Sequence, residues 1–349
     1  MKRVKRLFAC LLALTMMLGL SATAFATTSV DKSQAAVNGG EVTFTKEYKL
    51  NGAGESPAET FGFTIEKVDI KDGGTGSENQ GVPTMKSGAV FSKGAATTDG
   101  AQADATVKLP NYTAVGTYFY TISENAGTTA GVTYDDSTVT MKVIVINGEK
   151  DGEYKIGGVT FWKGEDKIDT GHAGGVDNEA AFSNTYTANK LNITKIVAGA
   201  LGDKKKDFEF TVTLTAPIDK KFDSVVTLKK SDGTSETVSF NGKAIGNGTE
   251  TVFGTATFKL KHGATASIEN LPSGVEYRVE ETKVTGYYTD KKNERGTMDA
   301  TEETATFTNT KNGGTDTGVY LDNLPYLLVF AGVLAIAAVF VVRRRRFED

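Results

Sequence analysis

Three reactive residue types, lysine, glutamate and asparagine, occur in the same order in the two halves of this 349-residue chain. Each lysine lies in an alternating strand-like run, each glutamate follows a tyrosine by four residues, and each asparagine stands in a Phe-x-Asn-Thr sequence. A neutral lysine amine can attack a side-chain carboxamide, and a nearby acid can protonate the ammonia that leaves. The order therefore indicates one self-linking reaction in each half. In chain order the six residues are Lys46, Glu124, Asn184, Lys195, Glu281 and Asn309.

This chemistry depends on burial, because a lysine in water has a pKa of about 10.4 and remains an ammonium ion. Apolar surroundings disfavour the ammonium and free the lone pair. We expect Lys46 to be buried among Phe44, Phe61, Phe63 and Phe182. A glutamic acid that keeps its proton in the same surroundings could donate to the amide oxygen and pass protons to the leaving ammonia. A single such lysine would usually be a surface residue, so the interpretation depends on the repeat.

The segments that carry these residues all have the pattern of β-strands. Gly accounts for 39 residues and Pro for only 6, and turn pairs such as Asn147-Gly148 and Asp232-Gly233 separate short β-branched runs. The pattern predicts an all-β chain of antiparallel sandwiches. Residues 71–102, rich in Gly, Ser, Ala and Thr, are expected to form a long loop outside the core. The expected strands are 41–48, 60–66, 103–109, 116–124, 137–147, 154–163, 190–197, 207–215, 223–229, 251–260, 263–269, 275–283 and 302–310.

Residues 1–26 have the order of a secretory signal peptide. A basic start is followed by an apolar run over 7–20 and by the small-residue sequence Ala24-Phe25-Ala26. The apolar run is too short for a first transmembrane helix. Cleavage after Ala26 would remove Cys10, the one cysteine of the chain, so a disulfide scaffold is excluded.

At the other end, residues 324–342 form an apolar run long enough for one membrane crossing. The four arginines that follow should stay on the cytoplasmic side. A Thr-Gly pair, an apolar span and a basic tail resemble the sorting signal of Gram-positive wall proteins, in which a sortase cuts between Thr and Gly. The resemblance implies cleavage within GTDTG (314–318), between Thr317 and Gly318. A plain C-terminal membrane anchor is the alternative.

The two repeats and both processing signals together resemble the Cna B-type, isopeptide-linked domains of two-domain major pilins of streptococcal type. The resemblance covers about residues 38–311. It implies two tandem immunoglobulin-like β-sandwich domains, 38–187 and 188–312, followed by a sorting region over 313–349 that includes a transmembrane helix.

The same resemblance assigns the bonds and the acids. The implied sets are Lys46 with Asn184 and Glu124, and Lys195 with Asn309 and Glu281. The bonds would close loops of 138 and 114 residues. By the estimate used for disulfides, each closure would stabilise its domain by roughly 5 kcal/mol. Each reaction would occur once within its own molecule, so the chain is not expected to be a turnover enzyme.

In that family, sortase joins each cut Thr carbonyl to a lysine near the end of the next subunit's N-terminal domain. The stretch FWKGEDK (161–167) resembles the family's acceptor run, which implies Lys167 as the acceptor and Lys163 as the second choice. About ten extra residues, 169–179, follow this run. The implied function is a structural shaft subunit of a wall-anchored pilus. The implied partners are sortase, other copies of the chain, minor pilins and peptidoglycan.

Composition limits the other functions. The formal charge is -4, and residues 27–317 carry 31 Lys and Arg against 40 Asp and Glu, about -9, so no nucleic-acid partner is expected. One Cys and two His give no basis for a metal site, and no cofactor is expected. Membrane contact is expected only through residues 324–342. A secreted glycosidase is disfavoured because Glu124 and Glu281 lie in separate repeats. An anchored adhesin or stalk that never polymerises remains the alternative.

Overall fold

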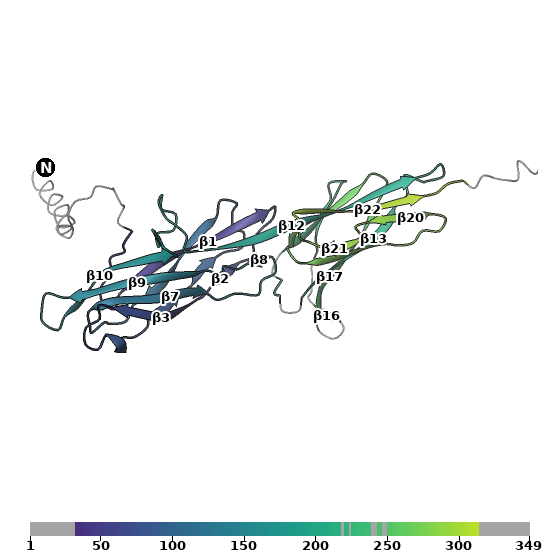
Figure 1. Cartoon of the computed structure of the whole chain (residues 1–349). Coiled ribbons are helices and arrows are strands. Elements are labelled where there is room, and N and C mark those ends of the chain that lie inside the picture. The colour runs from purple at the N-terminus through teal and green to yellow at the C-terminus, as the bar shows by residue number, and fades with distance from the viewer. Residues whose placement is uncertain (1–31, 218–219, 223–224, 239–242, 246–249, 314–349) are drawn as a thin grey trace, which may run out of the picture.

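The computed structural model describes residues 32–313 apart from 218–219, 223–224, 239–242 and 246–249. Within these residues the chain is built of strands and one short 3-10 helix, η1 (Ser77–Asn79), so the all-β prediction is confirmed. Figure 1 shows two β bodies arranged end to end, with one strand running between them. No helix within the described ranges is long and apolar enough to cross a membrane. The expected signal peptide, Thr317, Gly318 and the span 324–342 lie outside the described residues.

The first body contains a five-stranded sheet that faces part of a ten-stranded sheet, with a two-stranded sheet beside them. The five strands, in sheet order, are β11 (Asp166–Ile168), β10 (Tyr154–Lys163), β9 (Thr138–Asn147), β7 (Gly116–Glu124) and β3 (Phe63–Lys71). The facing strands are β12 (Phe182–Ala198), β1 (Glu41–Gly52), β6 (Ala101–Lys108) and β4 (Thr84–Ser87), with β8 (Val132–Thr133) paired to β12. The small sheet joins β2 (Glu59–Phe61) and β5 (Ala89–Phe91).

The second body repeats this arrangement with a second five-stranded sheet and the rest of the ten-stranded sheet. The five strands are β16 (Lys243–Ile245), β17 (Glu250–Leu260), β13 (Phe208–Pro217), β19 (Glu276–Glu281) and β21 (Arg295–Thr297). The remaining strands of the ten-stranded sheet are β15 (Ser235–Val238), β14 (Val226–Lys230), β18 (Thr265–Pro272), β22 (Glu302–Thr310) and β20 (Tyr288–Lys292).

The buried apolar residues form two separate clusters, one in each body. In the first, the ring of Phe63 lies 4.8 Å from that of Phe44 and 5.0 Å from that of Phe182, measured between centroids. In the second, the rings of Phe210 and Phe307 lie 5.2 Å apart. The residues of each cluster come from both facing sheets, so each body is a sandwich whose core lies between its sheets.

β12 is shared by the two bodies. Sequence analysis predicted a strand over 190–197 and only a separate strand-like pattern around Asn184, but the structure forms a single strand of 17 residues. This strand pairs in parallel with β1 and in parallel with β22. The predicted antiparallel arrangement is therefore wrong at the two strand pairs that join the first and last strands of each body.

The prediction for residues 71–102 is also wrong. This stretch contains β4, β5 and η1, and Ala89, Phe91 and Ala96 are buried. Phe91 packs against the rings of Tyr48 and Phe61, at centroid distances of 5.4 and 5.7 Å. A three-residue strand is too short to produce a recognisable alternation, so its contribution to the core depends on long-range contacts that composition does not reveal.

Candidate cross-linking sites

In the first body the side chains of Lys46, Glu124 and Asn184 meet in the core. Lys46 Nζ donates to Glu124 Oε2 at 2.6 Å and to Asn184 Oδ1 at 2.6 Å. Asn184 Nδ2 donates to Glu124 Oε1 at 2.5 Å. All three residues are shielded from solvent, the Lys46 and Glu124 side chains completely. An amine, a carboxamide and a carboxyl group are therefore in mutual contact inside the sandwich.

Strand register produces this contact. Lys46 of β1 lies opposite Phe182 of β12, and Asn184 follows two residues later. Residues two apart on a strand share one face, so Phe182 and Asn184 both point into the core beside Lys46. Glu124 is the last residue of β7 in the facing sheet, opposite Phe63. The bond partners thus lie in one sheet and the acid reaches them from the other.

The second body uses the same register. Lys195 lies opposite Phe307, two residues before Asn309, and Glu281 ends β19 opposite Phe210. The Glu281 carboxylate accepts from Lys195 Nζ at 2.8 Å and from Asn309 Nδ2. The Lys195 side chain is fully buried and that of Glu281 is 2% exposed. The two sets of residues that the sequence repeat singled out are brought together in separate cores.

Burial changes the acidity of both lysines. Desolvation in the core lowers the pKa of Lys46 to about 8, although its hydrogen bond to Glu124 acts in the opposite direction. Burial also lowers the pKa of Lys195, again opposed by its glutamate. The nearest aromatic rings are those of Phe61, 5.0 Å from Lys46 Nζ, and Phe208, 4.3 Å from Lys195 Nζ. Apolar surroundings thus favour the neutral amine that attack on a carboxamide requires.

The two sites differ at the carboxamide oxygen. Asn184 Oδ1 also accepts a hydrogen bond from the backbone N–H of Asp135, at 2.7 Å. Asn309 Oδ1 is buried and has no hydrogen-bond partner among the described residues. The repeat did not reveal this role of Asp135. The second half has an aspartate at the matching place, Asp290 opposite Thr308, yet Asn309 Oδ1 receives no such hydrogen bond among the described residues. The one local signal was the Asp-Asp-Ser turn sequence at 135–137, where Asp135 Oδ1 accepts from the Ser137 N–H.

The two lysines predicted as acceptors lie in the hairpin of β10 and β11. Trp162 is opposite Lys167, and Lys163 is opposite Asp166. The Lys163 side chain is 42% exposed, and its Nζ lies 3.8 Å from Asp135 Oδ2. Lys167 Nζ donates to Ser33 Oγ at 3.2 Å. Both lysines therefore lie on one hairpin at the surface, outside the core.

The extra residues 169–179 fold back onto this body. Thr170 Oγ1 accepts from the Thr45 N–H at 2.8 Å, and the Thr45 hydroxyl accepts from the Gly171 N–H at 3.0 Å. Asn178 Nδ2 donates to Gln102 Oε1 at 2.8 Å. These contacts attach the segment to β1 and β6, on the face of β1 opposite Lys46. The insertion therefore leaves the register around Lys46 unaffected.

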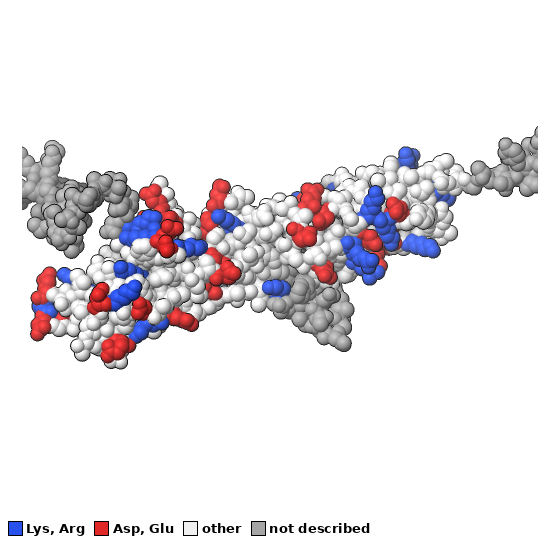
Figure 2. Space-filling model, in the orientation of Figure 1, with Lys and Arg blue, Asp and Glu red and all other residues white. Residues whose placement is uncertain are grey.

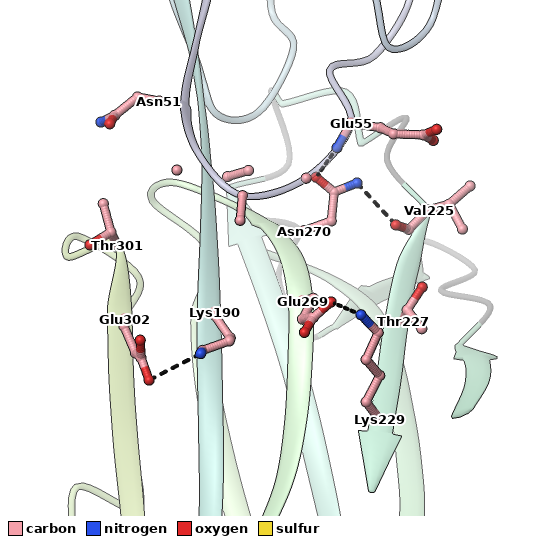
Figure 3. A pocket seen from close by; sticks show the side chains of 14 residues that line it. Asn51, Glu55, Lys190, Val225, Thr227, Lys229, Glu269, Asn270, Thr301 and Glu302 are labelled. Atoms are coloured by element: carbon pink, nitrogen blue, oxygen red, sulfur yellow. Dashed lines mark hydrogen bonds and ion pairs between the residues drawn. The ribbon is translucent and has the colours of Figure 1, made fainter. Parts of the chain in front are cut away.

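A groove of about 680 Å³ lies at the junction of the two bodies (Figure 3). Its central residue is Asn270, whose Oδ1 accepts from the Glu55 N–H at 3.2 Å and whose Nδ2 donates to the Val225 carbonyl at 3.0 Å. Its two lysines form ion pairs, Lys190 with Glu302 and Lys229 with Glu269. Asn270 therefore links the loop after β1 to the second body, and the groove is part of the joint between them.

Charged side chains of both signs are interspersed on the face shown in Figure 2. Within the described residues, no group of three or more His, Cys, Asp or Glu could hold a metal ion. Among the described residues, the two lysines that are fully buried, Lys46 and Lys195, both belong to the lysine, glutamate and asparagine sets. These sets are the chemical centres of the described chain.

Comparisons with known proteins agree with this arrangement. Residues 42–187 match the Spy0128-like isopeptide containing domain, and residues 189–311 match a domain of unknown function (DUF7601). The chain is 27% identical over 354 residues to a pilin of Streptococcus pyogenes serotype M1, covering 94% of this chain and 97% of that protein. The chain is thus similar to a streptococcal pilin over nearly its whole length, and its first body matches an isopeptide containing domain. Both findings agree with the resemblance that the repeats indicated.

Solved structures of major pilins have the same fold. One major pilin of Streptococcus pyogenes is 22% identical, with a TM-score of 0.54, and another, T3.2, is 20% identical, with a TM-score of 0.52. Each alignment covers 79% of this chain and all of the solved chain. A 99-residue stretch is also 36% identical to the pilus tip adhesin Cpa of Streptococcus pyogenes, covering 28% of this chain and 12% of the adhesin.

Proposed function

We propose that this chain is the structural shaft subunit of a sortase-assembled, wall-anchored pilus, stabilised by two self-formed Lys–Asn bonds. The observation that carries the proposal is the occurrence of two lysine, glutamate and asparagine sets at equivalent registers in two sandwich cores. Residues 38–187 and 188–312 would be its two Cna B-type domains. Each bond would join the first strand of a domain to its last.

In the proposed reaction, the lone pair of Lys46 Nζ attacks Asn184 Cγ. The new C–N bond forms as the bond to Nδ2 breaks, and one proton from the amine passes through Glu124 to the departing ammonia. Glu124 is in place for this transfer, because its two carboxyl oxygens contact the amine and the leaving nitrogen. Glu281 has the same two contacts in the second core. The reaction happens once in each site and modifies the chain itself. The pilin would therefore not be an enzyme that turns over an external substrate.

Assembly would use the sorting sequence and the lysines of the β10–β11 hairpin. Sortase would cut between Thr317 and Gly318 and join the Thr317 carbonyl to a lysine of the next copy. Lys167 is the proposed acceptor, with Lys163 as the second choice. The product would lie on the cell surface, joined to minor pilins and finally to peptidoglycan, after a precursor stage held in the membrane by residues 324–342. The alternative is an anchored adhesin or stalk of the same domains that never polymerises.

Intact mass spectrometry of the exported region tests the bonds directly. We expect the mass to fall short of the sequence value by two ammonia molecules, because each bond expels one. Glu124→Ala and Glu281→Ala should each restore one ammonia, because the proton-transfer group is lost. Glu280→Ala is the matched control, since Glu280 adjoins Glu281 but its side chain is 56% exposed and pairs with Arg278. A mass equal to the sequence value would contradict the proposal.

The rate of the first bond should rise with pH. With the pKa of Lys46 lowered to about 8, the neutral amine is the minor form at pH 6 and the major form at pH 9. Below the pKa, each pH unit multiplies the neutral fraction by about ten, so the rate should increase about tenfold per unit and level off above pH 8. Refolding the unreacted chain at a set pH, with acid quenching and peptide mass analysis, measures this. A rate that is flat from pH 6 to 8 would mean that amine deprotonation does not limit the reaction.

A further inference from the structure

The strongest unexplained feature of the chain is the asymmetry between its two cross-linking sites. Asn184 Oδ1 has two donors, Lys46 Nζ at 2.6 Å and the Asp135 N–H at 2.7 Å. Asn309 Oδ1 is buried with no donor among the described residues. Both sites have the same lysine, acid and asparagine in the same register. The hydrogen bond from the Asp135 N–H therefore distinguishes two sites that are otherwise built alike.

We propose that the backbone N–H of Asp135 acts as an oxyanion donor for the first bond and orients its asparagine, and that the second bond forms more slowly without such a donor. This inference deepens the proposed function and depends on it. The catalytic group is the backbone amide, which contacts a reacting atom, and the Asp135 side chain is a positioning group.

The orientation follows from hydrogen-bond chemistry. A backbone N–H can only donate, so the carboxamide atom that faces Asp135 must be the oxygen. The NH₂ group of Asn184 is then directed at Glu124, which has to protonate it as it leaves. A carboxamide rotated by half a turn would place its oxygen against Glu124 and its NH₂ against a donor. The Asp135 N–H therefore selects the orientation that can react.

The electrostatic effect acts on the same atom. When Lys46 Nζ attacks Cγ of Asn184, the electron pair of the C=O bond moves onto Oδ1, and negative charge develops there. A preorganised N–H donor in a dry core stabilises this charge, and removal of one such donor typically costs about 100-fold or more in rate. The charge returns to the C=O bond when the C–Nδ2 bond breaks and ammonia leaves.

The Asp135 carboxylate holds the donor in place. Its Oδ1 accepts from the Ser137 N–H at 2.9 Å, and its Oδ2 accepts from the Ser183 N–H at 2.8 Å, one residue before Asn184. The residues after β8 are thereby attached to β12 beside the reacting carboxamide. Lys163 Nζ, 3.8 Å from Oδ2, adds an ion pair at the surface side of this contact.

The second site has a different strand at the equivalent place. There β20 pairs with β22 as a regular antiparallel ladder, with Thr289 opposite Asn309. In such a ladder alternate N–H groups of β20 bond to the backbone of β22, and the others point away from β22 in the plane of the sheet, so none is directed at a side chain in the core. In the first site, β8 ends after two residues, and the chain that follows is free to turn its Asp135 N–H toward Asn184.

The test measures both bonds in one chain. Unreacted full-length chain is refolded, quenched in acid at intervals and digested, and the two cross-linked peptides are quantified. We expect the first bond to form at least tenfold faster than the second. Equal rates, or a faster second bond, would overturn the inference while leaving the proposed function intact. The absence of both bonds would instead contradict the proposed function.

Two variants separate the amide from the side chain. Asp135→Pro removes the N–H and should slow the first bond by about 100-fold. Asp135→Ala keeps the N–H and should slow it much less. The second bond is the internal control for the chemistry, and unchanged fluorescence of Trp162, the one tryptophan of the chain, shows that the first body still folds in each variant. If the alanine variant slows the first bond as much as the proline variant, the carboxylate rather than the N–H is responsible and the inference is wrong.

Discussion

Under a pulling force, the Glu281→Ala chain is expected to lengthen by up to about 400 Å, while the unaltered chain keeps a constant length. In the unaltered chain, load applied at the two ends would pass from Lys46 to Asn184 through the first bond, along β12 to Lys195, and through the second bond to Asn309. The 114-residue loop between Lys195 and Asn309 would carry no load. Without the second bond that loop lies on the load path and unravels. Single-molecule force spectroscopy measures the step.

Matched variants test the same path at the other bond. Glu124→Ala should release the 138-residue loop and give a longer step, up to about 480 Å. Glu280→Ala should give no step, because its exposed side chain lies outside the core. Loss of either bond should also lower the free energy of unfolding of its domain by roughly 5 kcal/mol. A step in the unaltered chain, or none in the glutamate variants, would show that the load does not pass through these bonds.

Lys167→Ala is expected to convert a covalent ladder of subunits into monomer. If Thr317 is joined to a lysine of the next copy, cell-wall extracts should contain species at multiples of the subunit mass that resist heat and detergent, because amide bonds survive both. Removal of the acceptor amine stops the transfer. Both internal bonds should remain, since Lys167 lies on the hairpin outside the two cores. Gel electrophoresis of wall extracts and mass analysis of the secreted monomer measure the two effects.

Lys163→Ala is the comparison for this experiment. Lys163 lies on the same hairpin, opposite Asp166, with a partly exposed side chain whose Nζ lies near Asp135. If this variant loses the ladder and Lys167→Ala keeps it, the acceptor is Lys163. If neither variant loses the ladder, the acceptor lies elsewhere. A monomer in the unaltered strain would favour the anchored adhesin or stalk.

The sequence by itself was sufficient to single out the lysine, glutamate and asparagine residues that meet in each core, the all-β class and the resemblance to major pilins. The reason is that the chemistry is repeated: a lysine strand, a Tyr-x-x-x-Glu run and a Phe-x-Asn-Thr run occur twice in one order. Alternation along a strand is a local property, so Lys46 and Phe44 could be placed on one face before any fold was known. The predicted burial of Lys46 among phenylalanines is confirmed by the structure.

Only the tertiary structure decided how these residues meet and how the two sites differ. The parallel pairing of β12 with β1 and β22, and its continuity between the bodies, depend on contacts between segments more than a hundred residues apart. The burial of Phe91 in a stretch that resembled a loop has the same origin. Asp135 lies 49 residues from Asn184, and its backbone N–H is common to nearly every residue type. A pattern of side chains cannot predict a backbone donor of this kind. Its role depends on the path of the backbone after β8 and not on the residue type at position 135.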